Sequence, residues 1–299
     1  VEVTTLRQDV VTDGRRAEVA FGTDWVADAA RRDFTINALY CFADGRLFDP
    51  LGGAGDLING RVRFIGDAAQ RIAEDGLRVY RFFRFSASHG GERFDPEGLS
   101  ACQAAADELD HISRERVGAE MLRMLALPRV ATTLALMDRL GLVRLAPGAV
   151  PALKRYEALG GQSAAARLAM LGRDDLARRQ ADWRLSKALV GHAERVAESS
   201  ALLRRGDVGW AAYRFGEDAV EGLAVAAAEE GWLREQLAEL AREMGRLPVA
   251  PLPVGGADLE ARGMKPGPDM GAALAIMERA WVESEFSASK DALLERIFH

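Results

Sequence analysis

The sequence contains few of the residues that build large sheets, disulfide frameworks or membrane spans. Its 299 residues include only 10 prolines and 7% aromatic residues, which favours helices and leaves little material for a β-sandwich. The two cysteines, Cys41 and Cys102, are too few for a disulfide framework, and neither has a Cys or His at zinc-ligand spacing. No apolar run approaches the roughly 18 residues that a transmembrane helix needs. We therefore expect a largely helical, cytoplasmic protein without structural zinc or a membrane span.

The composition is that of a globular protein with more than one substructure. Hydrophobic residues make up 48% of the chain and charged residues 28%, values that argue against disorder. A chain of this length usually exceeds what one hydrophobic core serves. The formal net charge is −6, yet residues 61–93 contain seven arginines against four acidic residues. A basic stripe can therefore lie on an acidic protein.

Strand-like patterns are confined to about the first 50 residues. The chain opens at Val1 without Met and alternates from its first residue like a strand within a sheet, so we expect part of this unit to precede Val1. Residues 38–42 and 46–48 predict a hairpin, and residues 24–31 predict a short helix. From residue 67 onward, apolar residues recur every three or four positions, which predicts helices. The first five predicted helices span 67–73, 75–88, 96–109, 113–126 and 129–140.

These patterns predict an α+β fold, in which a small, partial mixed α/β unit precedes predominantly α-helical regions. Glycine and proline clusters mark the expected boundaries. The expected regions are 1–56, 57–140, 141–247 and 248–299. The last of these should hold two or three short helices around residues 263–268.

The first concentration of polar chemistry is the segment Arg31-Arg32-Asp33-Phe34-Thr35-Ile36-Asn37. Two guanidinium groups, a carboxylate and an amide supply donors for phosphate or ribose oxygens and an acceptor for a hydroxyl. By itself the segment is equally compatible with a helix end whose charges are solvated.

The second concentration lies at residues 71–85. On a helix, Asp75, Arg78, Arg81 and Arg84 stand three apart and form one polar ladder. Pairing of Asp75 with Arg78 would leave Arg81 and Arg84 without partners, and an anionic ligand would then satisfy them. Asp75 and Arg78 can offer an acceptor and two donors to the edge of cytosine or adenine, and such contacts discriminate by about 1–3 kcal/mol.

Four motifs in this order resemble the class II (bacterial type) tRNA nucleotidyltransferase and poly(A) polymerase family. They are the Arg31–Leu39 segment, Asp49-Pro50-Leu51-Gly52-Gly53-Ala54-Gly55-Asp56-Leu57, Glu74-Asp75-Gly76-Leu77-Arg78 with Arg81 and Arg84, and Ser113-Arg114-Glu115-Arg116 with Glu120. The resemblance implies a head at 1–56, a neck at 57–140, a body at 141–247 and a tail at 248–299. It also implies addition of C, C and A to tRNA 3′ ends from CTP and ATP, with Mg²⁺.

The resemblance also implies roles for individual residues. Arg32 would contact the triphosphate or ribose, while Asp33 and Asn37 would shape the ribose side. Asp75 and Arg78 would read the base, and Arg81 and Arg84 would hold phosphate or orient that pair. A head–neck hinge is implied for Gly52, Gly53, Gly55 and Asp56, and support of the neck for Ser113, Arg116 and Glu120. Glu120 or Glu115 would brace an arginine of the base-reading helix. The tail segment 263–268 would either contact a tRNA phosphate or form a plain corner between helices.

The chain departs from the family in its metal site. Members carry a Gly-Gly-x-Val-Arg-Asp segment and an Asp-x-Asp pair that holds two Mg²⁺, and neither pattern occurs in these 299 residues. We therefore expect the Mg²⁺ ligands upstream of Val1, and no activity from the 299 residues if such a segment does not exist. Three functions stay open: a CCA-adding enzyme or one half of a divided CC-adding and A-adding pair, a poly(A) polymerase, and a non-catalytic RNA- or nucleotide-binding protein.

Overall fold

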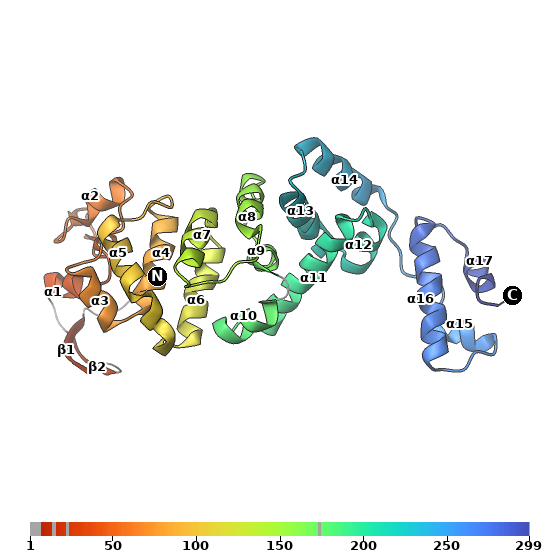
Figure 1. Ribbon diagram of the computed structural model, residues 1–299, viewed down its shortest axis with the longest axis horizontal. Coiled ribbons are helices and arrows are strands. Elements are labelled where there is room, and N and C mark those ends of the chain that lie inside the picture. The colour runs from red at the N-terminus through yellow and green to blue at the C-terminus, as the bar shows by residue number, and fades with distance from the viewer. Residues whose placement is uncertain (1–6, 14–15, 22–23, 173–174, 299) are drawn as a thin grey trace.

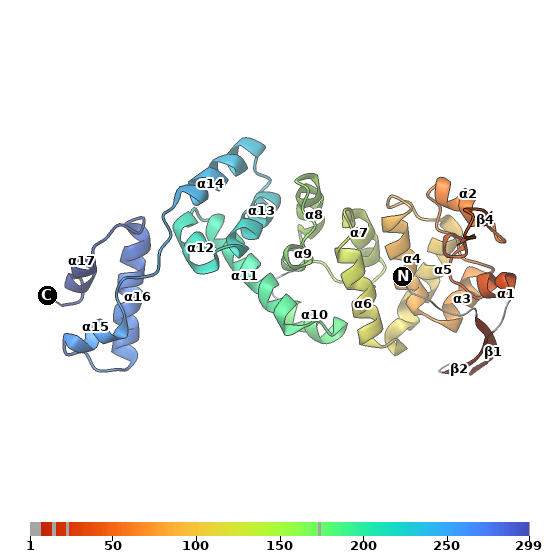
Figure 2. The ribbon, with the colours of Figure 1, turned by 180° about the vertical axis from the view of Figure 1, so that it is seen from behind.

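The protein forms an elongated row of helices with a small strand-containing end. The computed structural model describes residues 7–13, 16–21, 24–172 and 175–298. The chain runs from the strands at one end, through successive helical layers, to the C-terminal helices at the other, as both faces show (Figures 1 and 2). This arrangement confirms the predicted α+β class.

The N-terminal end contains two antiparallel pairs of strands and short helices. Strand β1 pairs with β2 from Arg7↔Phe21 to Asp13↔Arg16, and β3 pairs with β4 through Tyr40↔Phe48 and Cys41↔Leu47. The hairpin predicted at 38–48 and the helix predicted at 24–31 are confirmed, whereas residues 1–6 of the predicted opening strand lie outside the described residues. The elements are β1 (Arg7–Asp13), β2 (Arg16–Phe21), α1 (Trp25–Ala30), the 3-10 helix η1 (Thr35–Asn37), β3 (Tyr40–Cys41), β4 (Leu47–Phe48) and α2 (Gly53–Ile58).

The next region is an all-helical layer whose central helix, α4, is buried on one side by aromatic rings. Phe82 and Phe83 are fully buried, and Phe82 stacks on Phe64 with ring centroids 5.5 Å apart. The predicted helices are confirmed to within a few residues, except that the predicted helix 75–88 begins at Leu77. The elements are α3 (Ala68–Glu74), α4 (Leu77–Ser88), α5 (Pro96–Ala105), η2 (Ala106–His111), α6 (Arg114–Leu125) and α7 (Ala131–Arg139).

Helices α8 to α14 follow, and a buried arginine joins them to the preceding layer. Arg167 on α9 is fully buried, and its guanidinium donates to the carbonyls of Leu125, Leu127, Pro128 and Gly161. It thereby caps the end of α6, whose last carbonyls have no partner within the helix. The elements are α8 (Ala149–Ala158), α9 (Ala164–Leu171), α10 (Leu176–Trp183), α11 (Lys187–Leu203), α12 (Val208–Phe215), α13 (Asp218–Glu230) and α14 (Arg234–Arg246).

The C-terminal unit has a hydrophobic core of its own. It comprises α15 (Gly256–Ala261), α16 (Pro268–Glu283) and α17 (Lys290–Glu295), as predicted for this region. Its buried cluster is separate from the main one, which runs without interruption from Phe34 to Ala228. The main core therefore crosses the expected boundaries at residues 56 and 140, so any division there is one of shape rather than of separate cores.

Candidate nucleotide-binding site

Asp75 lies in the turn between α3 and α4 and not on a helix. Its backbone is extended (φ −154°, ψ 102°), which ends α3, and α4 begins two residues later. One carboxylate oxygen accepts from the Leu77 N–H at 3.1 Å, and the other accepts from the Arg116 guanidinium at 2.7 Å. The predicted four-residue helical ladder is therefore wrong at its first member. Asp75 is held from a neighbouring helix, α6.

Arg78 occupies the first turn of α4 and points back along α3. Its guanidinium donates to Glu74 at 2.7 Å and to the carbonyl of Arg71 at 2.6 Å. The predicted pairing of Asp75 with Arg78 is consequently wrong, because each side chain has a different partner. The two side chains, which are three residues apart in the chain, are thus positioned by separate partners.

Glu74 pairs with Arg78, and the spacing of four between them is the signal of a helical ion pair, although no role was expected for Glu74. No role was expected for Arg71 either. Besides bonding Glu74, Arg71 donates to the carbonyls of Arg31 and Arg32 at 2.6 and 2.5 Å. These bonds attach α3 to the end of α1.

Asp33 connects the N-terminal end to α4. Its carboxylate, which is buried, accepts from the Asn37 amide at 2.7 Å and from Arg81 Nε at 2.6 Å. The backbone around it pairs with the segment before α3, because Ile65 N donates to the Asp33 carbonyl at 3.0 Å. Asp33 and Asn37 therefore lie together, as the resemblance implies, but the Asp33 oxygens are already bonded within the protein.

Glu120 on α6 is the centre of a cluster of arginines. Its carboxylate is almost fully buried and contacts Arg84 at 2.5 Å, Arg123 at 3.0 Å and Arg81 at 3.5 Å. The inference that Arg81 and Arg84 lack protein partners is therefore wrong. Burial disfavours the charge on Arg81, but Asp33 and Glu120 outweigh that effect and raise its pKa above the ordinary value. The expected contact of Glu120 with an arginine of α4 is confirmed.

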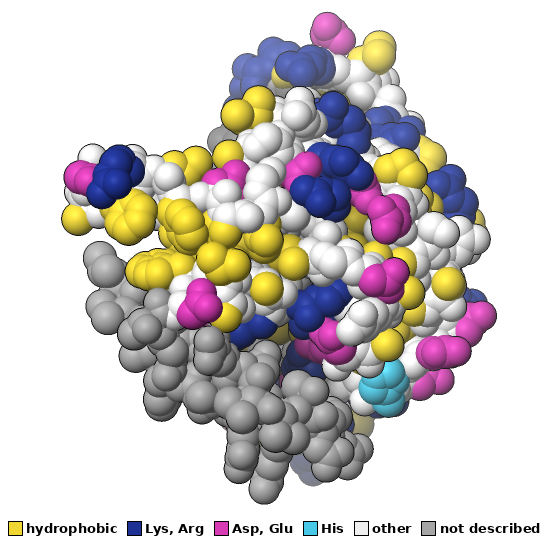
Figure 3. All heavy atoms as spheres, turned by 90° about the vertical axis from the view of Figure 1, so that its left-hand side faces the viewer, with side chains coloured by type: hydrophobic (Ala, Val, Ile, Leu, Met, Phe, Trp, Pro, Cys, Tyr) yellow, Lys and Arg dark blue, Asp and Glu magenta, His cyan; other side chains and the backbone are white. Residues whose placement is uncertain are grey.

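Arg32 shares a buried carboxylate with its neighbour. Asp28 on α1 accepts from Arg31 at 2.5 Å and from Arg32 at 2.8 Å, and the Tyr40 hydroxyl also donates to it at 2.9 Å. Burial works against the charge of Arg32, yet the hydrogen bond to Asp28 raises its pKa on balance. Arg32 Nη1 also donates to the Asn37 carbonyl at 2.9 Å, and more than a third of the Arg32 side chain is exposed. Seen from this end of the molecule, basic and acidic side chains lie interspersed on the surface (Figure 3).

The segment assigned to a hinge forms a short helix that is fastened to η1. Gly52 directly precedes α2 and has a positive φ of 73°, and a Cβ on Gly53 would lie 2.1 Å from the Thr35 carbonyl oxygen. Buried Asp56 accepts from the Thr35 hydroxyl at 2.7 Å and pairs with Arg63 at 2.9 Å. Gly55 has open space around it. Glycine is thus required at two positions here for geometric reasons.

The start of α6 carries the residues expected to support the site. Ser113 caps the helix by accepting from the Arg116 N–H at 3.2 Å. Glu115, the alternative brace considered from the sequence, pairs instead with Arg184 at 3.3 Å. Within the described ranges, no three His, Cys, Asp or Glu side chains lie together in a way that could hold a metal ion. The residues present therefore do not fit the two-metal site of the resembled family.

Known proteins and family models are similar to this chain over most of its length. Family models match residues 1–63 (poly A polymerase head domain), 93–153 (probable RNA- and SrmB-binding site of polymerase A) and 164–297 (tRNA nucleotidyltransferase domain 2). The mitochondrial CCA tRNA nucleotidyltransferase 1 of Danio rerio is 33% identical over 99% of this chain and 72% of its own length. The CCA-adding enzyme of Levilactobacillus brevis is 30% identical over 99% of this chain and 79% of its own length.

The chain belongs to the family of CCA-adding tRNA nucleotidyltransferases. The crystal structure of the Bacillus stearothermophilus CCA-adding enzyme with CTP superposes with a TM-score of 0.79 at 28% identity, covering 98% of this chain and 78% of that one. A Thermotoga maritima CCA-adding enzyme complexed with tRNA shares the fold, with a TM-score of 0.61 at 17% identity, covering 91% of this chain and 73% of that one. The chain is accordingly a nucleotidyltransferase by family.

Within the described residues, no helix is both long enough and apolar enough to cross a membrane. Because the Danio rerio and Mus musculus relatives are mitochondrial proteins, the cytoplasmic location expected from the sequence stays a prediction.

Proposed function

We propose that this CCA-adding enzyme selects CTP and ATP for addition to tRNA 3′ ends through Asp75 and Arg78. The observation that supports this proposal most directly is their separate anchoring. Arg116 orients the Asp75 carboxylate, while Glu74 and the Arg71 carbonyl orient the Arg78 guanidinium. A carboxylate acceptor beside guanidinium donors matches the edge of cytosine, and after a small shift that of adenine.

The surrounding residues have supporting roles in this proposal. Arg32 contacts the triphosphate or ribose through its exposed part, while Asp33 and Asn37 define the ribose side. Arg81 and Arg84 orient the base-reading turn through their bonds to Asp33 and Glu120, in preference to holding phosphate. This choice follows from their buried protein partners. Ser113, Arg116 and Glu120 support the neck from α6.

The regions and cofactor expected from the sequence also belong to the proposal. We assign a head to residues 1–56, a neck to 57–140, a body to 141–247 and a tail to 248–299, with the hinge at Gly52–Asp56. Mg²⁺ is the metal expected for the reaction. Since the described residues do not form a group that fits it, no step of the selection mechanism is assigned to a metal.

The function is tested by incubating the protein with tRNA that ends at the discriminator base, Mg²⁺ and labelled nucleotides, singly and combined. Incorporation from CTP and then ATP in a fixed order is the expected result. Runs made from ATP alone would indicate a poly(A) polymerase. Nucleotide binding without incorporation would indicate a non-catalytic RNA- or nucleotide-binding protein.

Base selection is tested separately by equilibrium binding of CTP, ATP, UTP and GTP. We expect Asp75→Asn to lower the preference for CTP and ATP over UTP by roughly tenfold, because an amide, unlike a carboxylate, can also donate to the O4 carbonyl of uracil. Asp67→Asn is the control, since Asp67 also accepts a backbone N–H of α3, from Gln70. Arg116→Leu removes the same ion pair but keeps the carboxylate, so it should cost less. Undiminished preference in the Asp75 variant would refute base reading by this residue.

The phosphate contact is tested with a pair of neighbouring arginines. Arg32→Ala should weaken all four nucleotides alike, by roughly tenfold, because the contact does not involve the base. Arg31→Ala is its matched control, since both arginines share Asp28. Equal losses in the two variants would show that the effect comes from Asp28 and not from a contact to the ligand.

A further inference from the structure

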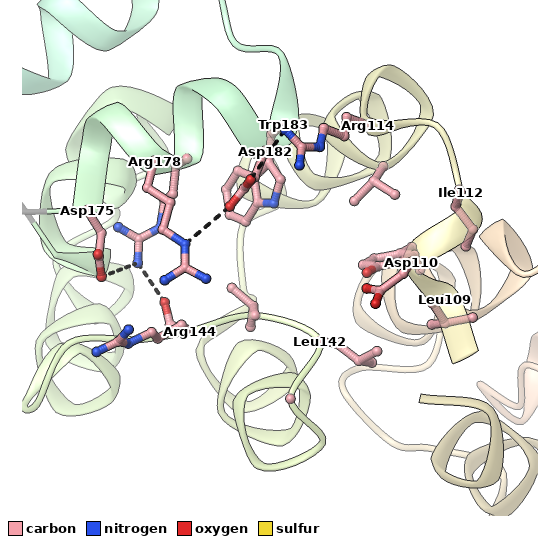
Figure 4. A pocket seen from close by; sticks show the side chains of 15 residues that line it. Leu109, Asp110, Ile112, Arg114, Leu142, Arg144, Asp175, Arg178, Asp182 and Trp183 are labelled. Carbon is pink, nitrogen blue, oxygen red and sulfur yellow. Dashed lines mark hydrogen bonds and ion pairs between the residues drawn. The ribbon is translucent and has the colours of Figure 1, made fainter. Parts of the chain in front are cut away.

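A pocket of about 530 Å³ lies between the neck and the body, apart from the base-reading turn. Its walls come from η2 and the start of α6 on one side, and from α10 and residues 141–144 on the other (Figure 4). Tyr80 lines it from α4. Tyr80 leaves that helix on nearly the opposite side from Arg78, because two residues rotate a helix by about 200°. The pocket is therefore distinct from the proposed nucleotide-selection site.

The frame of this pocket is fixed by close packing. A Cβ on Gly118 would lie 1.8 Å from the Trp183 carbonyl oxygen, so α6 and α10 are in direct backbone contact. On the other side, buried Arg179 donates to the carbonyls of Arg144, Leu171 and Gly172 at 2.6–2.9 Å. These bonds attach α10 to residues 141–144 and to the end of α9. A pocket built between such fixed elements is preformed, as ligand sites usually are.

One side of the pocket is basic, with donors to spare. Arg114 and Arg178 both approach a single carboxylate, Asp182, at 3.8 and 3.4 Å. Charge-assisted hydrogen bonds are normally about 2.7–2.9 Å long, so both pairs are loose. Both arginine side chains are also more than half exposed. Figure 4 shows them flanking the same opening. Two converging guanidinium groups with unused N–H donors are suited to a phosphate.

The opposite side carries an acceptor. Asp110 points toward the pocket from η2 (Figure 4), and in the described part of the chain its carboxylate has no hydrogen-bond or ion-pair partner. Burial raises the pKa of Tyr80, and the negative charge of Asp110 raises it further. Between the two polar sides lie apolar and aromatic surfaces from Val117, Leu142 and Trp183.

We propose that this neck–body pocket binds a single nucleotide, with its phosphate between Arg114 and Arg178 and its base toward Asp110. A carboxylate can accept hydrogen bonds but cannot donate them. It therefore favours bases with an amino group, namely adenine, cytosine and guanine, over uracil, whose N3–H lies between two carbonyl oxygens. The apolar surfaces between the charges suit the faces of a base. The nucleotide is either a free monophosphate or an unpaired nucleotide of RNA, since both present the same groups.

The test measures AMP and UMP binding by calorimetry in an Asp75→Ala, Arg78→Ala background, which removes the proposed selection site. We expect AMP to bind, and Arg178→Ala to weaken it roughly tenfold, as expected for a lost charged hydrogen bond. Asp110→Asn should remove the preference for AMP over UMP. Arg205→Ala is the matched control, because Arg205 is equally exposed and pairs loosely with Asp207 at 3.7 Å.

Unchanged AMP binding in both pocket variants would overturn the proposal, as would inorganic phosphate binding as tightly as AMP. Thermal melting of each variant confirms that it is folded. Comparison of AMP with a short oligoadenylate distinguishes a free nucleotide from RNA as the source. Because this background lacks Asp75 and Arg78, AMP binding measured in it does not depend on whether those two residues select bases.

Discussion

The proposed neck, residues 57–140, is joined to the proposed head and the proposed body by buried charges of opposite sign. The head–neck junction consists of Asp33, Arg81, Arg84, Glu120 and Arg123, in which three guanidinium groups surround two buried carboxylates. At the neck–body junction the buried charge is a guanidinium, that of Arg167, and main-chain carbonyls take up most of its donors.

Arginine has a different role at each of the two junctions. In the head–neck junction, positive charge is in excess, and Arg123 in particular stays largely exposed. In the neck–body junction, Glu157 lies 3.8 Å from Arg167 and accepts from the N–H groups of Val130 and Ala131 at 2.7 and 3.0 Å. Arg167 and Glu157 thus fix the turn between α6 and α7 from both its carbonyl and its amide side. The first junction keeps cationic groups near the candidate site, and the second mainly fixes the backbone.

The largest effect is expected at the neck–body junction. Arg167→Met should lower the free energy of unfolding by about 3–5 kcal/mol, because Glu157 and several buried carbonyls lose their partner. Urea denaturation measures the change. Arg155→Ala is the control, since Arg155 also donates to two carbonyls, of Ala228 and Glu229, but from the surface. Equal losses in the two variants would contradict the special role of the buried guanidinium.

A smaller loss is expected at the head–neck junction. Glu120→Gln should cost about 1.5–3 kcal/mol, the usual value of hydrogen bonds to charged groups, because the arginines around it are partly solvated. Glu115→Gln on the same helix is the control, as its ion pair with Arg184 is exposed and should contribute little. If Glu120→Gln destabilised the protein more than Arg167→Met, the contrast between the junctions would be wrong.

The smallest effect concerns pH. Burial raises the pKa of Glu157 above its ordinary 4.5, although hydrogen bonds from Val130 and Ala131 oppose the shift. The folded protein therefore holds this proton to higher pH than the unfolded chain does. Its contribution to stability is fully present below about pH 4.5 and is lost as pH rises through the folded pKa. Denaturation across this window should show a steeper fall for the wild type than for Glu157→Gln, and parallel curves would contradict the assignment.

Local sequence signals predicted the elements that carry the candidate site. Asp24, Asp67 and Ser113 each cap the helix that follows through a side-chain bond to a backbone N–H, which is why the helix starts were predicted to within a residue or two. The start of α4 was predicted two residues too early, because the spacing of three that links Arg78, Arg81 and Arg84 was extended back to Asp75. At Asp75 the chain is extended, and the Leu77 N–H is capped by its side chain.

The ionic partners within the site could not be predicted in the same way. Arg84 meets Glu120 across 36 residues, Arg116 meets Asp75 across 41, and Arg81 meets Asp33 across 48. Sequence spacing favours the partner three or four residues away, and this rule suggested the wrong pair for Asp75. It would have found Glu74 for Arg78, where the helical spacing is real.

The order of motifs, the helical periodicity and the capping residues are properties of the chain itself, and they were sufficient for the fold class and the family. Which arginines are held within the protein, and which have donors left for a ligand, was decided only when α6 packed against α4 and α10. A guanidinium pairs with whichever carboxylate the packing brings within reach, and that proximity is not encoded in local spacing.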